Sequence, residues 1–229
     1  MSLSDQSTSS NPAKRFLEIK SGKVQFYDKE EGHNVEVALP FEFTVLDTLA
    51  TIKGWSDADD SGFWSNEVKS VGKDTLTVRT KSGAKASGIW KEIKTLPALS
   101  GAKYFSSVYI AANGRDGLEI NNLRLSGAAL NAWIEFTGKT DLKKNKVVIS
   151  GWLDAKKGAV KYQTPVFEAV PFQGDEKDEA VTLDLELKEY LEQYFNYVPD
   201  SEQAPAKNTK DVVLDDIDEE PIDLDEIPF

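Results

Sequence analysis

Short segments in which apolar and polar residues alternate, separated by turns that contain glycine, run from Phe16 to Phe172. The clearest is residues 35–45, where six apolar side chains recur at every second position and Pro40 indicates an edge strand or a bulge. Further strands are predicted at 16–20, 23–28, 75–81, 103–112, 118–125, 145–154 and 159–169. So many strands with few helices predict a mainly β fold, either a barrel or a sandwich.

Two segments have helical periodicity. Residues 126–136 place Ala129, Trp133 and Phe136 on one stripe, and residues 182–197 repeat Leu and Tyr at helical spacings. The first half of the second segment also alternates, so a strand remains an alternative there. We expect both segments to pack against the sheet.

Composition divides the chain into three parts. Residues 1–12 are expected to be a disordered arm, 13–198 the folded domain, and 199–229, rich in Pro, Asp and Glu, a disordered tail. Residues 1–170 contain 23 Lys or Arg and 20 Asp or Glu, a net charge of +3, whereas residues 171–229 contain 4 and 19, a net charge of −15; together they give the −12 of the chain. A weakly basic body with a strongly acidic end is typical of a nucleic-acid binder, although a solvating tail on an ordinary domain is the alternative.

Several classes of function are disfavoured by the residues that are missing. The chain has no Cys and one His, His33, so disulfides, thiolate metal sites and His-rich metal sites are excluded. The acidic loop 57–64 lacks the ligand spacing of a calcium loop, so no metal or cofactor is expected. No residue pattern points to catalysis, so we do not expect an enzyme. Without a signal peptide or an apolar run of membrane-spanning length, a soluble, cytoplasmic protein is expected.

The chain ends in an acidic run followed by an apolar tip and a free carboxylate, which suits capture by an apolar pocket with a basic rim. The predicted docking residues are Asp223, Asp225, Glu226, Ile227, Pro228 and Phe229. This ending resembles the C-terminal tip of bacterial and phage single-stranded DNA-binding proteins, where acidic residues precede a terminal Ile-Pro-Phe. It differs in having Leu224 among the acids and Glu226 in place of an aspartate, and it covers under a tenth of the chain. The resemblance implies an elaborated OB-like barrel and recruitment of replication, recombination and repair proteins.

Binding of single-stranded DNA needs cations that follow the phosphates and exposed rings on which bases stack. Two basic runs, 69–103 and 139–161, contain or adjoin such rings. The candidates in and beside the first run are Trp64, Arg79, Lys81, Lys85, Trp90, Lys91, Lys103, Phe105 and Tyr109. Those in the second run are Lys143, Lys144, Lys146, Trp152, Lys156, Lys157 and Lys161. Trp55 and Phe63 could also stack on bases, but at least one ring near the acidic loop is expected in the core.

Strand parity indicates which of these rings face solvent. Trp152 lies on the polar face of strand 145–154, so its ring is expected to be exposed unless both faces are buried. In strand 103–112, Phe105 and Tyr109 share a face opposite the apolar Val108 and Ile110 and are expected to face solvent, again unless both faces are covered.

These observations favour a protein that coats single-stranded DNA without strong sequence preference and recruits partner proteins through its C-terminal tip. A β-sandwich module that stacks sugar rings on its tryptophans is an alternative from another class. A structural or assembly protein with a solubilising tail is a third.

Overall fold

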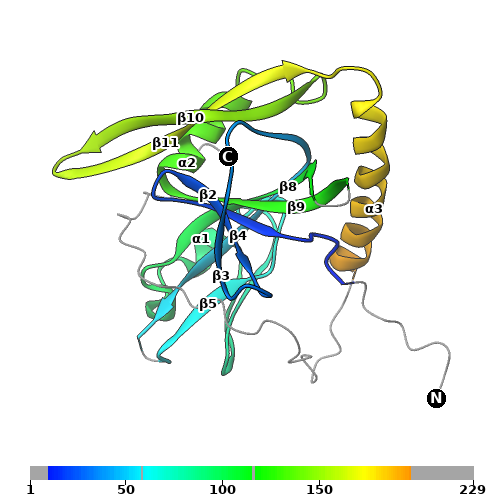
Figure 1. Ribbon diagram of the computed structural model, residues 1–229. Helices are drawn as coiled ribbons and strands as arrows, with labels where there is room; N and C mark the ends of the chain where they lie inside the picture. The colour runs from blue at the N-terminus through cyan, green and yellow to red at the C-terminus, as the bar shows by residue number, and fades with distance from the viewer. Residues whose placement is uncertain (1–9, 58, 115–116, 197–229) are drawn as a thin grey trace.

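The computed structural model describes residues 10–57, 59–114 and 117–196, which form strands in one mixed sheet system and a few helices at its margins (Figure 1). The strands are β1 (Phe16–Lys20), β2 (Lys23–Asp28), β3 (His33–Val37), β4 (Phe41–Ser56), β5 (Ser61–Ser65), β6 (Leu76–Thr80), β7 (Gly83–Gly88), β8 (Lys103–Asn113), β9 (Leu118–Leu125), β10 (Asn145–Lys157) and β11 (Val160–Pro171). The helices are α1 (Trp90–Ile93), α2 (Gly127–Thr137) and α3 (Glu176–Asn196), with a 3-10 turn at Pro97–Leu99.

The sheet is open rather than closed. Its strands run in the order β3-β2-β1-β9-β8-β4-β5-β6-β7, and β10 pairs with both β4 and β11. Within the described parts of the chain, β1 and β9 are parallel and the other paired strands are antiparallel. The 16-residue β4 pairs in turn with β10, β8 and β5. The number and length of the strands confirm the mainly β class. No described pair joins the edge strands β3 and β7, so the sheet is not closed and an OB-like barrel is not confirmed.

Most strands lie where the alternation predicts them. The hairpins β1–β2 and β10–β11 and the strands β6, β8 and β9 are confirmed. The single strand expected at 35–45 is wrong, because β3 ends at Val37 and β4 begins at Phe41. Proline has no backbone N–H, so a continuous ladder cannot pass Pro40. The two halves consequently pair with different partners, β3 with β2 and β4 with β8.

Both expected helices are confirmed. In α2, Trp133 packs edge-on against Phe167 of β11, with the ring centroids 5.1 Å apart. Helix α3 begins at Glu176, earlier than predicted, so the strand alternative for this segment is wrong. Leu187 and Leu191 lie one turn apart on α3 and are buried against the sheet. No helix in the described ranges is long and apolar enough to cross a membrane.

The two faces of the sheet differ in how far they are covered. On the core face, Val108 and Leu123 pack with α2 and the β10–β11 hairpin, and Ile52 and Leu76 pack with α1 and the 3-10 turn. On the opposite face, α3 packs against one end of the sheet, where it covers Tyr109. Figure 1 shows α3 standing alongside the sheet rather than across it. The rest of this second face is left without a covering helix in the described structure.

Candidate nucleic-acid interface

The part of the second face that α3 does not cover carries aromatic and cationic side chains, and we call it the open face. Residues paired across neighbouring strands point to the same side of a sheet, so the register defines its members. Lys53 of β4 pairs with Trp64 of β5 and with Lys103 of β8. Trp64 in turn pairs with Arg79 of β6. The members are Phe16, Glu18, Gln25, Tyr27, Lys53, Trp55, Trp64, Arg79, Lys103, Phe105 and Arg124.

Four rings of the open face are exposed to solvent. Trp55 of β4 and Trp64 of β5 have 48% and 39% of their surface exposed, and Phe16 and Tyr27 are exposed on β1 and β2. Side chains stand roughly perpendicular to a sheet, so these rings project from the open face. Exposed rings on neighbouring strands can stack on successive bases of an unpaired strand.

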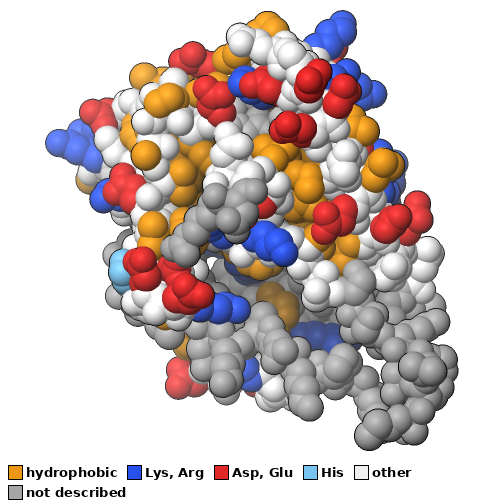
Figure 2. Space-filling view, turned by 45° about the vertical axis from the view of Figure 1, so that its right-hand side comes forward, with side chains coloured by type: hydrophobic (Ala, Val, Ile, Leu, Met, Phe, Trp, Pro, Cys, Tyr) orange, Lys and Arg blue, Asp and Glu red, His pale blue; other side chains and the backbone are white. Residues whose placement is uncertain are grey.

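Two cations of the open face lie over aromatic rings. The Lys53 ammonium is 5.5 Å from the centroid of the Phe105 ring, and the Arg124 guanidinium is 4.5 Å from the centroid of the Phe16 ring. Burial, and then the positive charge of Arg124, lower the pKa of Lys53 from 10.5 to about 7. Burial also lowers the pKa of Arg124. Figure 2 shows Lys or Arg and hydrophobic side chains at the base of a hollow in the lower half of its view.

Where α3 covers the sheet, Glu67 joins the helix to the strands. Glu67 accepts hydrogen bonds from the hydroxyls of Ser107 and Tyr109, the second at 2.7 Å, and its backbone N–H donates to the Tyr194 hydroxyl of α3 at 2.7 Å. Burial, and then the charge of Glu67, raise the pKa of Tyr109, and burial raises the pKa of Tyr194 to about 12. The prediction that Tyr109 stacks on a base is wrong, because its ring is fully buried under α3.

No match to this chain is found among protein-family models, curated proteins or solved structures. What the open face can bind is therefore inferred from its own side chains. Of the residues predicted from the sequence, Trp64, Arg79, Lys103 and Phe105 are brought together there. Phe105 is only partly exposed, since Lys53 lies over its ring.

The other members of the first basic run lie elsewhere. Lys81 is exposed at the β6–β7 turn, and Lys91 is exposed on α1. The prediction that Trp90 stacks on a base is wrong: it is only 6% exposed, because α1 turns it toward the core face. Phe63 is in the same core cluster, which confirms that one ring near the acidic loop packs inside.

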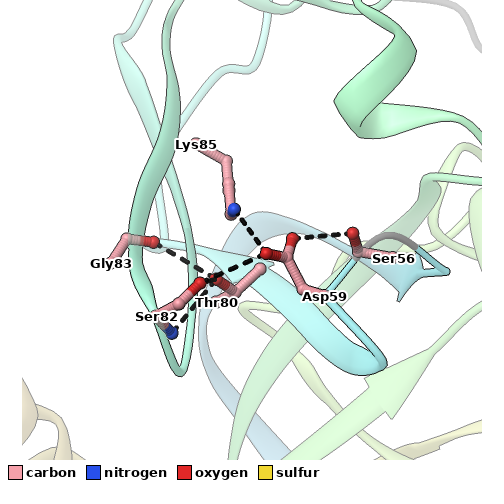
Figure 3. Close-up of polar contacts among 6 residues, drawn as sticks. All are labelled: Ser56, Asp59, Thr80, Ser82, Gly83 and Lys85. Atoms are coloured by element: carbon pink, nitrogen blue, oxygen red, sulfur yellow. Dashed lines mark hydrogen bonds and ion pairs between the residues drawn. The ribbon is translucent and has the colours of Figure 1, made fainter.

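Lys85 belongs to a polar network at the end of the sheet (Figure 3). Its ammonium lies 2.6 Å from Asp59, whose carboxylate also accepts hydrogen bonds from Ser56 at 2.8 Å and Ser82 at 3.3 Å. The hydrogen bond from Lys85, followed by that from Ser56, lowers the pKa of Asp59. These contacts join the β4–β5 turn to the β6–β7 turn and so fix the edge of the open face. No group of three or more His, Cys, Asp or Glu among the described residues could hold a metal ion.

The second basic run is distributed over the β10–β11 hairpin and the turn before it. Figure 1 shows this hairpin extending beyond the body of the molecule. Near its end, Lys156, Lys157 and Lys161 are exposed, and Lys143 and Lys144 are exposed in the turn that precedes β10. These five lysines are therefore accessible but are not part of the open face.

Lys146 is held in place by two carboxylates. Its ammonium lies 2.8 Å from both Glu176 of α3 and Glu42 of β4, and the hydrogen bonds that it donates to Glu176 and then to Glu42 raise its pKa. The predicted DNA-binding role of Lys146 would require these ion pairs to open, so the structure favours a role in docking α3.

Trp152 lies on the core side of its hairpin, and the reason is a β-bulge. The register between β10 and β11 slips by one residue at Ser150. One extra residue reverses the alternation of faces beyond it. Trp152 is thus partly buried against the core cluster, whereas Leu153 is 61% exposed. The prediction that Trp152 lies on the polar face is wrong: Trp152 packs against the core, as the alternative expected, but because of the bulge and not because both faces of the hairpin are covered.

Two cations of the open face were missed from the sequence, as were the exposed rings of Phe16 and Tyr27. Arg124 alternates with Leu123 and Leu125 in a strand that was correctly predicted, so strand parity could have marked it as facing away from the core. Lys53 shares its parity with Trp55, but that signal appears only once β4 is known to continue to Ser56. The predicted docking residues 223–229 lie outside the described residues, as do residues 1–9 of the predicted arm.

Proposed function

We propose that this protein binds single-stranded DNA on the open face without strong sequence preference. The observation that carries the proposal is the exposure of Trp55 and Trp64 on the same uncovered sheet face as Lys53, Arg79 and Arg124. Unpaired bases stack on such rings while the phosphates between them meet the cations. Every base has an aromatic face, so binding of this kind tolerates any sequence.

A single strand suits this face better than a duplex. The rings project from a sheet, and bases inside a duplex are already stacked on each other and cannot lie flat on them. Contacts between the phosphates and the cations of the open face make the affinity dependent on salt, because each neutralised phosphate releases counterions. Lys156, Lys157 and Lys161 are exposed on the β10–β11 hairpin and add positive charge elsewhere on the molecule.

The finer parts of the proposal depend on the chain's ending. Its resemblance to the tip of bacterial and phage single-stranded DNA-binding proteins supports recruitment of replication, recombination and repair proteins in a bacterial or phage-infected cell. The same resemblance, with the long β4 that pairs with three other strands, supports an OB-like relationship for the fold. The acidic residues of 199–229 are proposed to compete with DNA for the basic surface at low salt.

Titration of the intrinsic tryptophan fluorescence with oligo-dT, at low and at high salt, tests the proposal. We expect quenching at low salt that weakens steeply as salt is raised. Duplex DNA of the same length is the matched competitor and should displace the oligonucleotide poorly. No quenching by oligo-dT at low salt would rule the proposal out. Salt-insensitive quenching by a soluble polysaccharide would instead favour a carbohydrate-binding module, because sugar stacking on tryptophan needs no phosphate-binding cations.

A further inference from the structure

Two cations at the centre of the open face, Lys53 and Arg124, have no ion-pair partner within residues 10–57, 59–114 and 117–196. They project from β4 and β9, on either side of β8. Each lies over a ring of the open face, Lys53 over Phe105 and Arg124 over Phe16. Each charge is therefore partly shielded from water by an aromatic ring, and no carboxylate of the described residues forms an ion pair with it.

The nearest carboxylates are engaged with other groups. Glu67 accepts hydrogen bonds from Ser107 and Tyr109, and Glu18 accepts one from the Gln25 amide at 2.8 Å. Both carboxylates act on Lys53 and Arg124 through space, as their effect on the pKa of each cation shows, but neither contacts them. The charge of Arg124 lowers the pKa of Lys53, so the two cations repel each other, and with only distant compensation they form a site suited to an added anion.

We propose that Lys53 and Arg124 together bind one phosphate group of a single-stranded DNA backbone, and that Lys53 takes up a proton as the phosphate arrives. This inference rests on the proposed function. The planar guanidinium of Arg124 can hold two phosphate oxygens, and the Lys53 ammonium adds a mobile point charge. When Lys53 turns from Phe105 toward the phosphate, it uncovers the ring face that a neighbouring base needs for stacking.

Proton uptake follows from the surroundings of Lys53. Burial and the charge of Arg124 hold its pKa near 7 in the free protein, and an anion in contact favours the ammonium form and raises that pKa. The affinity for DNA should therefore fall as the pH rises through 7. If the Lys53 ammonium keeps its proton in the complex throughout this range, linkage predicts that the affinity for DNA falls by up to about 30-fold from about pH 6 to about pH 8.5.

Other charged groups face the same region. They are Arg124 of β9, Lys103 of β8, Arg79 of β6, Glu18 of β1 and Glu67 in the segment after β5. The one histidine, His33, lies on β3 and is exposed near the β2–β3 turn, away from this group. A His33→Gln variant therefore serves as the control for titration of a histidine.

The experiment measures the affinity of the full chain for oligo-dT without a terminal phosphate, at constant ionic strength, across this pH range. We expect the wild type and His33→Gln to lose affinity with rising pH. Lys53→Arg should bind with nearly constant affinity, because a guanidinium keeps its charge throughout. Lys53→Met should bind more weakly than the wild type at the acidic end, show little dependence on pH, and have a salt slope smaller by about one.

A spectroscopic readout does not depend on any variant binding DNA. The Lys53 side-chain ¹³Cε signal, assigned by its loss in Lys53→Arg, should titrate near pH 7 in the free protein and at a higher pH with oligo-dT bound. An unchanged midpoint on binding, or a pH dependence preserved in Lys53→Arg, overturns the inference while the DNA-binding function stands. Failure of the wild type to bind oligo-dT at any pH overturns both.

Discussion

Replacing Trp64 by alanine removes one of the four exposed rings of the open face. Trp64 is 39% exposed and lies directly opposite Lys53 and Arg79 on the neighbouring strands. Stacking of one base on an aromatic side chain contributes about 1–3 kcal/mol, which corresponds to a loss of roughly 5- to 150-fold in affinity for oligo-dT. The affinity should fall at every salt concentration, since stacking involves no counterion release.

The amplitude of fluorescence quenching by bound DNA is a second quantity that the Trp64→Ala variant should change. The chain has five tryptophans, of which Trp90 and Trp133 are buried in the core and Trp152 is partly buried on the core side of its hairpin. Quenching by bound bases should therefore come chiefly from Trp55 and Trp64. Trp64→Ala should lose a large part of the quenching amplitude, and the double variant with Trp55→Ala should lose most of it.

The assay is a fluorescence titration with oligo-dT, paired with an anisotropy measurement on a labelled oligonucleotide so that affinity and quenching are obtained separately. Trp152→Phe is the matched control, because it removes a tryptophan outside the open face. Equal losses of affinity in Trp152→Phe and Trp64→Ala, or full quenching in the double variant, would show that bases do not stack on the open face. Circular dichroism should show that all the variants are folded.

Three further predictions concern the rest of the chain. Asp59→Asn should lower the thermal unfolding midpoint at neutral pH, because the hydrogen bond from Lys85 stabilises the ionised carboxylate and lowers its pKa in the folded protein. This contribution to stability is present above the pKa of 3.8 of the unfolded chain and is lost as the pH falls through the lower pKa of the folded protein. The unfolding midpoints of the wild type and the variant should therefore converge in melts at acid pH. Deleting Pro228 and Phe229 should abolish pull-down of tip-binding partners and leave the oligo-dT affinity nearly unchanged, and a large fall in DNA affinity would contradict this division of roles. Removing residues 199–229 should raise the oligo-dT affinity at low salt but not at high salt, and equal affinities at low salt would argue against competition by the tail.

Features that depend on neighbouring residues were predictable from the sequence. The strands β6, β8 and β9, two hairpins and the helices α2 and α3 follow from hydrophobic periodicity, which each segment carries within itself. Part of the site was predictable as well, since residue type and the basic run singled out Trp64, Arg79 and Lys103, which strand pairing then places on one face. Their gathering was not predictable, because the sequence does not state which strands are neighbours.

Predictions from strand parity failed where a single residue shifts the register of a strand or interrupts it. Ser150 adds one residue to β10 and exchanges the faces of Trp152 and Leu153. Pro40 divides one predicted strand into two that pair with different partners. Neither effect alters the local alternation by much, yet each reverses or redirects the side chains that follow.

The amino-acid sequence alone determined the mainly β class, the positions of most strands, the uneven charge and the acidic, apolar-tipped ending, because these depend on residue type and order. Only the tertiary structure decided which face of the sheet stays open. Helix α3 lies far along the chain from β8. It packs on one end of the sheet and buries Tyr109, while at the other end Trp64 stays exposed and Lys53 partly exposed. Burial depends on contacts between segments distant in sequence, so no local pattern could tell the covered ring from the exposed one.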